Sequence, residues 1–140
     1  MIESGGGEWS FFDFCYADDS NPIVDWYNGL SEDAQYQFDS LLKDQSKTVN
    51  HLNWTGWKGF LSGESRRERI WELRFYADGR QYRILGKFGS IRKQAILLCG
   101  CYHKGRVYTP ANAIETACKR SRALGSGEAK LCARKIRDNI

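Results

Sequence analysis

The amino-acid sequence predicts a small α+β fold, in which an antiparallel sheet of about four strands carries an N-terminal helical hairpin and a C-terminal helix on one face. Residues 70–77 and 82–88 alternate apolar and charged side chains, as half-buried strands do, and a nearly continuous apolar run follows at 94–102. Segments with helical spacing of apolar residues lie before and after these strands. At 140 residues the chain is expected to be one domain with a substantial core.

The predicted domain covers residues 8–124, between a flexible lead at 1–7 and a basic C-terminal extension at 125–140. Its first strand is expected at 8–16, where the aromatic-rich sequence EWSFFDFCY stands.

A helical hairpin is predicted next. Asn21 and Pro22 are typical of the N-cap and first turn of a helix, and Gly29 ends that helix. A second helix starts after Ser31, with acidic residues in its first turn, and continues to about residue 45. Its apolar stripe consists of Leu30, Ala34, Phe38, Leu41 and Leu42.

The central strands follow an irregular, Trp- and Gly-rich loop at 50–63. A tight turn at Asp78-Gly79 joins the first two of them as a hairpin. Alternation gives this hairpin an apolar face of Trp71, Leu73, Phe75, Tyr82, Ile84 and Phe88, and a second face of Glu72, Arg74, Arg83, Leu85 and Lys87. The apolar run at 94–102 is expected to be a central strand that is covered on both faces.

Helical signals return after this strand. Thr109-Pro110 is expected to open a helix as N-cap and first-turn residue. The sequence Gly125-Ser126-Gly127 is expected to end it. Residues 128–136 are expected to form a short final helix that is basic on its outer side.

Composition excludes several classes of protein. The sequence has no apolar run of about 18 residues, so no membrane span is expected, and its start lacks the basic flank and apolar centre of a secretion signal. The five cysteines include no CxxC pair, and only two histidines are present, so neither a metal site nor a cofactor is expected. Cys99 and Cys101 are interpreted as small core residues in a protein of the reducing cytoplasm.

Charge is unevenly distributed along the chain. Residues 1–50 contain ten acids and two bases, whereas residues 51–140 contain seven acids and nineteen bases. A basic second part indicates a nucleic acid or an acidic partner as ligand, unless the bases only solvate helix faces.

Basic side chains gather on the second face of the predicted hairpin. Arg74, Arg83 and Lys87 lie on two strands joined by a tight turn, where a sheet can bring them within reach of one phosphate. Arginine binds phosphate with two parallel hydrogen bonds, and such cations stabilise charge that develops on phosphorus. With the charge asymmetry, this makes RNA the leading ligand hypothesis.

The end of the apolar strand adds groups that can transfer protons. His103 and Lys104 lie where side chains project from the rim of the sheet, and histidine exchanges protons near neutral pH. Tyr108 can assist by hydrogen bonding. Such a set suits metal-independent RNA cleavage, in which a base deprotonates the ribose 2′-hydroxyl, cations stabilise the phosphorane and an acid protonates the leaving 5′-oxygen. DNA lacks the 2′-hydroxyl and would not react.

Each of these residues also has a structural explanation. Arg74 can pair with Glu72 or with a helix carboxylate. Arg83 can likewise have a structural role. His103 can be an ordinary loop histidine.

The loop at 50–63 is open to both kinds of interpretation. Trp54 and Trp57 can stack on bases, although Trp in a Gly-rich loop more often covers the edge of a core. His51 is interpreted as structural and Lys58 as solvated. The motifs GxxxxGK[ST], GxGxxG, HExxH and GxSxG are missing from the sequence, so nucleotide-binding, metalloprotease and serine-hydrolase functions lack support.

The segments WELRF, YRILGKF, AILLCGCYHK and YTPANAIETACKR, taken in this order, resemble the RelE/ParE toxin superfamily and are closest to its phage-derived HigB-like branch. The resemblance covers residues 12–122, and its specific part lies between Trp71 and Lys119.

This resemblance implies a RelE-like fold and the toxin of a type II toxin–antitoxin pair, which cleaves mRNA at the ribosomal A site and is inhibited by an antitoxin of helix-turn-helix type. By position, Arg74 and Arg83 correspond to the sheet arginines of such toxins. His103 and Lys104 correspond to the basic pair at the strand end, which includes the catalytic histidine, and Tyr108 is a supporting residue.

Lys87, Arg106, Lys58 and Trp57 complete the prediction as RNA-binding residues. After Lys104 the sequence reads GRVYTP, where relatives often carry a lysine-rich run, so dependence on the ribosome stays open. The alternatives are a non-enzymatic binding protein, such as a gyrase-type inhibitor or a binder of a host factor, and a protein that regulates transcription only through its partner.

Overall fold

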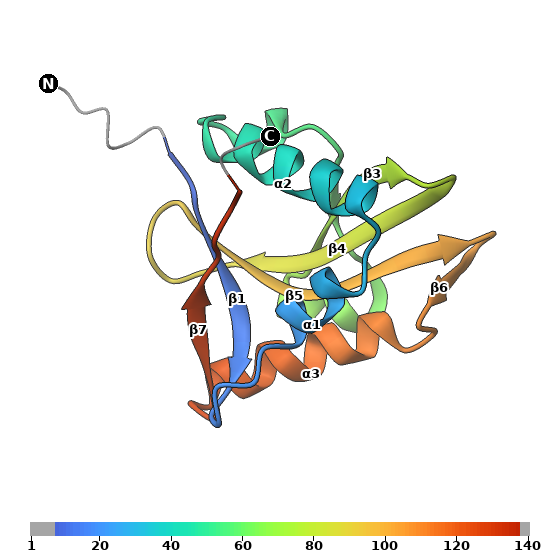
Figure 1. The fold of residues 1–140 in the computed structure, drawn as a ribbon. Coiled ribbons are helices and arrows are strands. Elements are labelled where there is room, and N and C mark those ends of the chain that lie inside the picture. Colours follow the sequence, from blue (N-terminus) through green and yellow to red (C-terminus); the bar gives the residue numbers. More distant parts are fainter. Residues whose placement is uncertain (1–7, 138–140) are drawn as a thin grey trace, which may run out of the picture.

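The computed structural model of the chain describes residues 8–137, which form one mixed sheet with helices on both of its faces (Figure 1). The N-terminal lead predicted at 1–7 lies outside the described residues. In chain order the elements are β1 (Ser10–Tyr16), α1 (Pro22–Asn28), α2 (Glu32–Ser46), η2 (His51–Asn53), β2 (Trp57–Phe60), η3 (Gly63–Glu68), β3 (Trp71–Ala77), β4 (Arg80–Phe88), β5 (Gln94–Lys104), β6 (Val107–Thr109), α3 (Ala113–Gly125) and β7 (Ala129–Ala133).

The sheet has seven strands, where the sequence predicted about four. Its order is β2-β3-β4-β5-β1-β7, and β6 pairs with the end of β5. The pair β1–β5 is parallel, and the other pairs are antiparallel. The strands that the sequence predicted are therefore present, and three further strands extend the sheet at its edges.

Two of the additional strands replace a predicted loop and a predicted helix. The segment at 50–63 contains η2 and the edge strand β2, rather than an irregular loop alone. The short helix predicted at 128–136 is wrong, because Ala129–Ala133 forms β7 against β1. A helix of so few residues is unstable by itself, whereas β1 offers a row of backbone partners.

The third additional strand moves the start of the last helix. Val107–Thr109 pairs with β5, so the chain is still extended at Thr109, and the helix starts at Ala113 with Asn112 before it. The predicted N-cap at Thr109-Pro110 is therefore wrong. The predicted end near Gly125 is confirmed.

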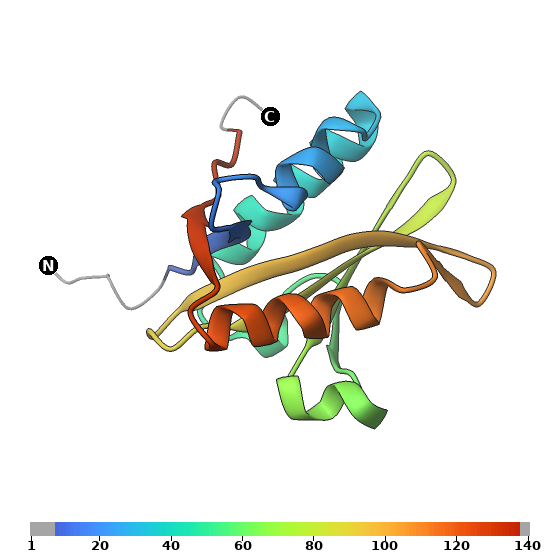
Figure 2. The ribbon, with the colours of Figure 1, turned by 90° about the horizontal axis from the view of Figure 1, so that it is seen from below.

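The helices do not share one face of the sheet, as the sequence predicted. The helical hairpin of α1 and α2 covers one face, and α3 lies with η3 on the other (Figure 2). Strand β5 explains this arrangement, because its apolar run presents Ala95 and Leu97 to the hairpin side and Ile96 and Leu98 to the α3 side. The central, doubly covered strand predicted at 94–102 is confirmed.

Part of the charge asymmetry is neutralised within the fold. Arg134, just after β7, pairs with Asp13 of β1 at 3.0 Å, and both side chains are buried. Arg137 pairs with Asp39 of α2 at 3.1 Å, and Lys130 pairs with Asp19. The basic C-terminal segment thus contacts acidic groups of the first part of the chain.

No helix in residues 8–137 has the length and apolar character needed to cross a membrane.

Helix α1 sits so close to β5 that only a glycine fits between them. A Cβ added at Gly100 would lie 2.2 Å from atoms of the Trp26 ring, which also packs edge-on against Phe38 of α2. The absence of a side chain at Gly100 therefore sets the depth at which the helical hairpin packs.

We predict that Gly100→Ala lowers the free energy of unfolding by about 1–3 kcal/mol, because the added methyl group overpacks the contact with Trp26. Gly125→Ala is the matched control, since a Cβ there meets nothing within 4 Å, and it should change stability by less than about 0.5 kcal/mol. Urea unfolding of both variants measures the difference. Equal stability of the two variants would contradict the proposed close approach.

Candidate active site

A β-bulge in β5 determines which side chains meet on the α3 side of the sheet. Leu85 of β4 pairs with Cys99 and the next residue, Gly86, pairs with Leu97, so Leu98 is an extra residue on β5. An extra residue shifts the alternation of the strand that follows it. As a result His103, which would otherwise point to the helical hairpin, lies on the same face as Arg83.

The carboxylate of Glu72 is the centre of a polar cluster on this face. Its Oε2 accepts hydrogen bonds from Arg74 Nε at 2.8 Å and from Arg83 Nη1 at 2.5 Å. Its Oε1 accepts one from the hydroxyl of Tyr108 at 2.6 Å. Arg83 Nη2 also donates to Gln81 Oε1 at 2.8 Å and to His103 Nδ1 at 2.9 Å. Strands β3, β4, β5 and β6 therefore each contribute to one connected network.

The register of the β3–β4 hairpin explains why a carboxylate is needed here. The turn at Asp78-Gly79 places Arg74 directly opposite Arg83. Like charges opposite each other on neighbouring strands repel. Glu72 lies between the two guanidinium groups and offsets this repulsion.

The cluster keeps an excess of positive charge. The side chains of Glu72 and Arg83 are only 3% and 4% exposed, whereas that of Arg74 is 35% exposed. One carboxylate offsets one of the two guanidinium groups, so one positive charge is left over, and Arg74 presents it to solvent. Lys104 is the last residue of β5 and Arg106 follows it in the turn to β6, and both residues are exposed.

Contacts of His103 determine the position of its proton. A guanidinium group can only donate, so Nδ1 accepts from Arg83 and the proton of the neutral ring is on Nε2. This Nε2 is buried and has no hydrogen-bond partner among the described residues. Burial, and next the positive charge of Arg83, lower the pKa of His103 below its ordinary value of 6.5. His103 is therefore a neutral donor at pH 7.

The pKa values of the two acidic partners reflect the same network. Burial would raise the pKa of Glu72, but hydrogen bonds from Tyr108, Arg74 and Arg83 together lower it below its ordinary value. Burial and the hydrogen bond to Glu72 raise the pKa of the Tyr108 hydroxyl. Tyr108 thus stays protonated, and its ring packs edge-on against His103 with 4.3 Å between the ring centres.

The structure brings together Arg74, Arg83, His103 and Tyr108 of the predicted catalytic residues, with Lys104 on the adjoining hairpin turn. Other predicted RNA-binding residues lie apart from this cluster. Lys87 donates to Ser121 of α3 at 2.8 Å, and Lys58 and Trp57 lie on the edge strand β2. Trp57 is half-buried in a group of aromatic rings with His51, Trp54, Phe60, Trp71 and Phe88.

Sequence reasoning missed the central part that Glu72 plays. Glu72 appeared only as a possible partner of Arg74, and Gln81 was not singled out. The two-residue turn at Asp78-Gly79 already determines that Arg74 and Arg83 are opposite each other, so a need for a nearby acid was a signal in the sequence. In residues 8–137, no group of three His, Cys, Asp or Glu side chains is placed to hold a metal ion.

Comparison with known proteins gives one finding. The family described as "Phage derived protein Gp49-like (DUF891)" matches residues 25–122, which span most of the helical hairpin, the cluster and most of α3. No curated protein and no solved structure matches the chain.

We predict that Glu72→Gln lowers the free energy of unfolding by about 3–5 kcal/mol at pH 7, because it leaves the buried Arg83 without its counter-charge. Glu32→Gln, on the exposed first turn of α2, is the control and should cost less than about 1 kcal/mol. Chemical denaturation of both variants measures the change. If both variants lost the same free energy of unfolding, the buried pair of Glu72 and Arg83 would contribute no more to stability than an exposed acid does.

The pH dependence of stability has a definite sign. Since the pKa of Glu72 is lowered on folding, its stabilisation is present above the ordinary value near 4.5 and is lost as the pH falls through the folded value. The wild type should therefore lose stability below about pH 4.5, while Glu72→Gln should lose less over the same range. Parallel curves for the two proteins would contradict this assignment.

Proposed function

The chain belongs to the phage-derived Gp49-like family, which is a RelE/ParE-like toxin family, and we propose that it is a toxin that cleaves mRNA without a metal ion, at the ribosome, and so inhibits translation. A cognate antitoxin, of helix-turn-helix type, holds it inactive in the proposed pair.

One observation carries this proposal. Two arginines and a tyrosine converge on one carboxylate, a neutral histidine with an unpaired Nε2–H joins them through Arg83, and the cluster keeps an uncompensated positive charge. Cations and preorganised donors are what a pentavalent phosphorane needs for stabilisation, because negative charge builds up on its oxygens. Lys104 and Arg106, which are exposed where β5 ends and in the turn that follows, add positive charge for a polyanion.

In the proposed reaction the ribose 2′-oxygen attacks the neighbouring phosphorus, and the bond to the 5′-oxygen breaks. The products are a 2′,3′-cyclic phosphate and a 5′-hydroxyl. Arg74 contacts the phosphate, because it is the exposed guanidinium. His103 donates through Nε2 to a non-bridging oxygen once RNA binding has exposed this buried atom, and Lys104 supplies the proton of the leaving 5′-oxygen.

The contacts of Arg83 give this residue a positioning role and set a condition for general base catalysis. Arg83 is buried against Glu72 and orients the His103 ring through Nδ1. His103 can take the proton of the 2′-hydroxyl on Nδ1 only when Arg83 turns its Nη2 away, for example onto the substrate phosphate. Binding of the phosphate then frees Nδ1 of His103 to act as a base, whereas in the free protein the hydrogen bond from Arg83 occupies this nitrogen.

The same contacts favour a second candidate function. Because Nδ1 of His103 is occupied and Arg83 is almost fully buried, the cluster also has the features of a structural network under a basic surface. A non-enzymatic binder, such as a gyrase-type inhibitor or a binder of a host factor, would need only this surface. His103 discriminates between the two functions, since a binder does not need its proton.

We predict that wild-type protein, added to a cell-free translation reaction, produces discrete new mRNA ends, and that His103→Ala reduces their rate of formation by about 100-fold or more. Arg74→Ala should reduce it by at least about tenfold through loss of a charge on the phosphate. Lys47→Ala, which removes an exposed lysine on the opposite side of the sheet, should cleave like the wild type. Mapping of 5′ ends with and without ribosomes measures the rates and the ribosome dependence.

Cleavage should also fall as the pH drops well below 6.5, because protonation of His103 abolishes its function as a base. New ends that His103→Ala still produces at the wild-type rate would remove this residue from the mechanism. Translation that continues without new ends would exclude the nuclease and favour the binding protein.

A further inference from the structure

A second group of basic and aromatic residues surrounds η3, outside the cluster around Glu72. One cavity of about 750 Å³ lies between η3 and α3 and is lined by Arg66, Arg67, Glu68 and Arg122. Another, of about 450 Å³, adjoins the ends of β2 and β4. The two cavities share Arg67 and Glu68, so they flank the same short helix.

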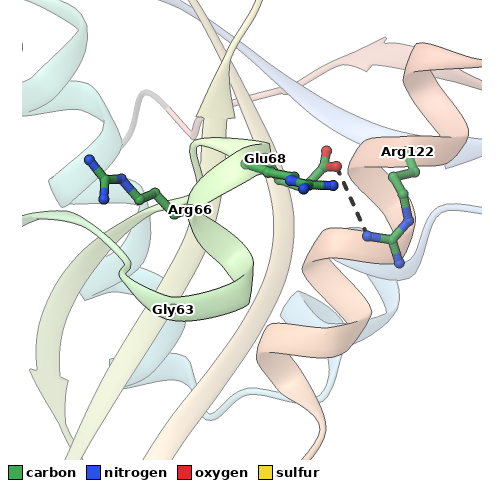
Figure 3. A pocket seen from close by; sticks show the side chains of 5 residues that line it. Gly63, Arg66, Glu68 and Arg122 are labelled. Carbon is green, nitrogen blue, oxygen red and sulfur yellow. Dashed lines mark ion pairs between the residues drawn. The ribbon is translucent and has the colours of Figure 1, made fainter.

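Positive charge predominates in these cavities. Their described lining includes the cations Arg66, Arg67, Arg69, Lys87 and Arg122, and the only carboxylate among the described lining side chains is Glu68. Figure 3 shows Arg122 of α3 turned towards Glu68, with Arg66 on the other side of η3. Glu68 also accepts a hydrogen bond from Ser121 at 2.7 Å. The carboxylate of Glu68 is therefore paired with Arg122, and the other cations of the lining are left to attract an anion.

The second cavity adds a flat platform to the positive charge. Phe60, on the edge strand β2, is 38% exposed, and the guanidinium of Arg69 lies 4.2 Å from the centre of its ring. Phe88 packs beside Phe60 with 6.2 Å between ring centres. Aromatic rings and guanidinium planes are the surfaces on which unpaired bases of single-stranded nucleic acid stack.

We propose that these two cavities form a second binding subsite for single-stranded RNA, in which Arg66 and Arg67 hold phosphates and the Phe60–Arg69 platform stacks a base. The inference rests on the proposed function and names where the substrate is held away from the cleavage cluster. An acidic polypeptide would satisfy the arginines but would leave the platform unused, so RNA is the ligand that both observations favour.

The position of Lys87 relates this subsite to the cleavage cluster. Lys87 lies four residues after Arg83 on β4, and both side chains belong to the same face of the sheet, so roughly 13 Å separate them along the strand. A mononucleotide cannot span that distance, whereas a short oligonucleotide can. The subsite should therefore increase affinity for oligonucleotides but not for single nucleotides.

Fluorescence anisotropy of a labelled uridine hexamer tests the proposal on the full-length protein. Arg67→Ala should raise Kd about tenfold and make the plot of log affinity against log salt shallower by about 0.7, the value for one lost phosphate contact on a single strand. Phe60→Leu should raise Kd about fivefold or more without changing that slope, because it removes stacking and no charge. Lys47→Ala should bind like the wild type, and thermal unfolding checks that every variant is folded.

Two results would overturn the proposal. In one, Arg67→Ala and Phe60→Leu bind the hexamer as the wild type does. In the other, a hexaglutamate peptide displaces the RNA and its own binding depends on Arg67 but not on Phe60, which would assign the cavities to an acidic polypeptide.

Because this readout is binding, it is independent of cleavage. Hexamer binding that depends on Phe60 and Arg67, in a protein that produces no mRNA ends, would support the subsite and exclude the nuclease. If the protein produces new mRNA ends but neither substitution changes its affinity for the hexamer, the nuclease is supported and the subsite is excluded.

Discussion

The buried carboxylate of Glu72 is the group on which the polar interior of this sheet depends. Two guanidinium groups that face each other on β3 and β4 would repel without it, and one of them is almost fully removed from water. A buried charge is tolerated when an opposite charge and hydrogen bonds compensate for lost hydration. Glu72 supplies both to Arg83, and through Arg83 it also sets the tautomer of His103. Loss of this one carboxylate would therefore disturb side-chain contacts on β4, β5 and β6 at the same time.

Local signals in the sequence predicted the elements that depend on neighbouring residues. The helix that Asn21 caps, the turn at Asp78-Gly79 and the apolar strand at 94–102 are all present. What failed depended on distant partners. Strand β7 exists because β1, more than a hundred positions earlier, offers it an edge, and β6 exists because β5 continues past the core. Strand β5 has apolar side chains on both faces, so helices must cover both faces of the sheet. The sequence predicted the two apolar faces of this strand, but all helices were placed on one face.

The candidate site shows the same division between local and distant information. The pattern of charges in the sequence predicted Arg74, Arg83 and His103 as site residues, and the structure places them in one network. The bulge at Leu98, which brings His103 to that face, has no signature in the apolar run around it. The burial of Arg83 could not be predicted either, because its side-chain partners Glu72, Gln81 and His103 come from three different strands.

The basic residues of the second part of the chain fall into two groups in the structure. The bases after β7 contact acids of β1 and α2, so they fasten the ends of the fold together. The bases of η3 lie beside α3 (Figure 2), in a cavity where Glu68 is the only carboxylate among the described lining side chains. A count of charges in the sequence cannot separate these groups, although only the second is available to a polyanion.

The place of β1 in the sheet has a consequence for biosynthesis. This strand lies between β5 and β7, so both of its neighbours are made after it, and more than a hundred residues separate it from β7. Pairing between distant segments forms late because long loops must close first. A growing chain therefore carries β1 with an open edge until β7 has left the ribosome. The buried pair of Arg134 and Asp13 beside this edge can form only after β7 has been made.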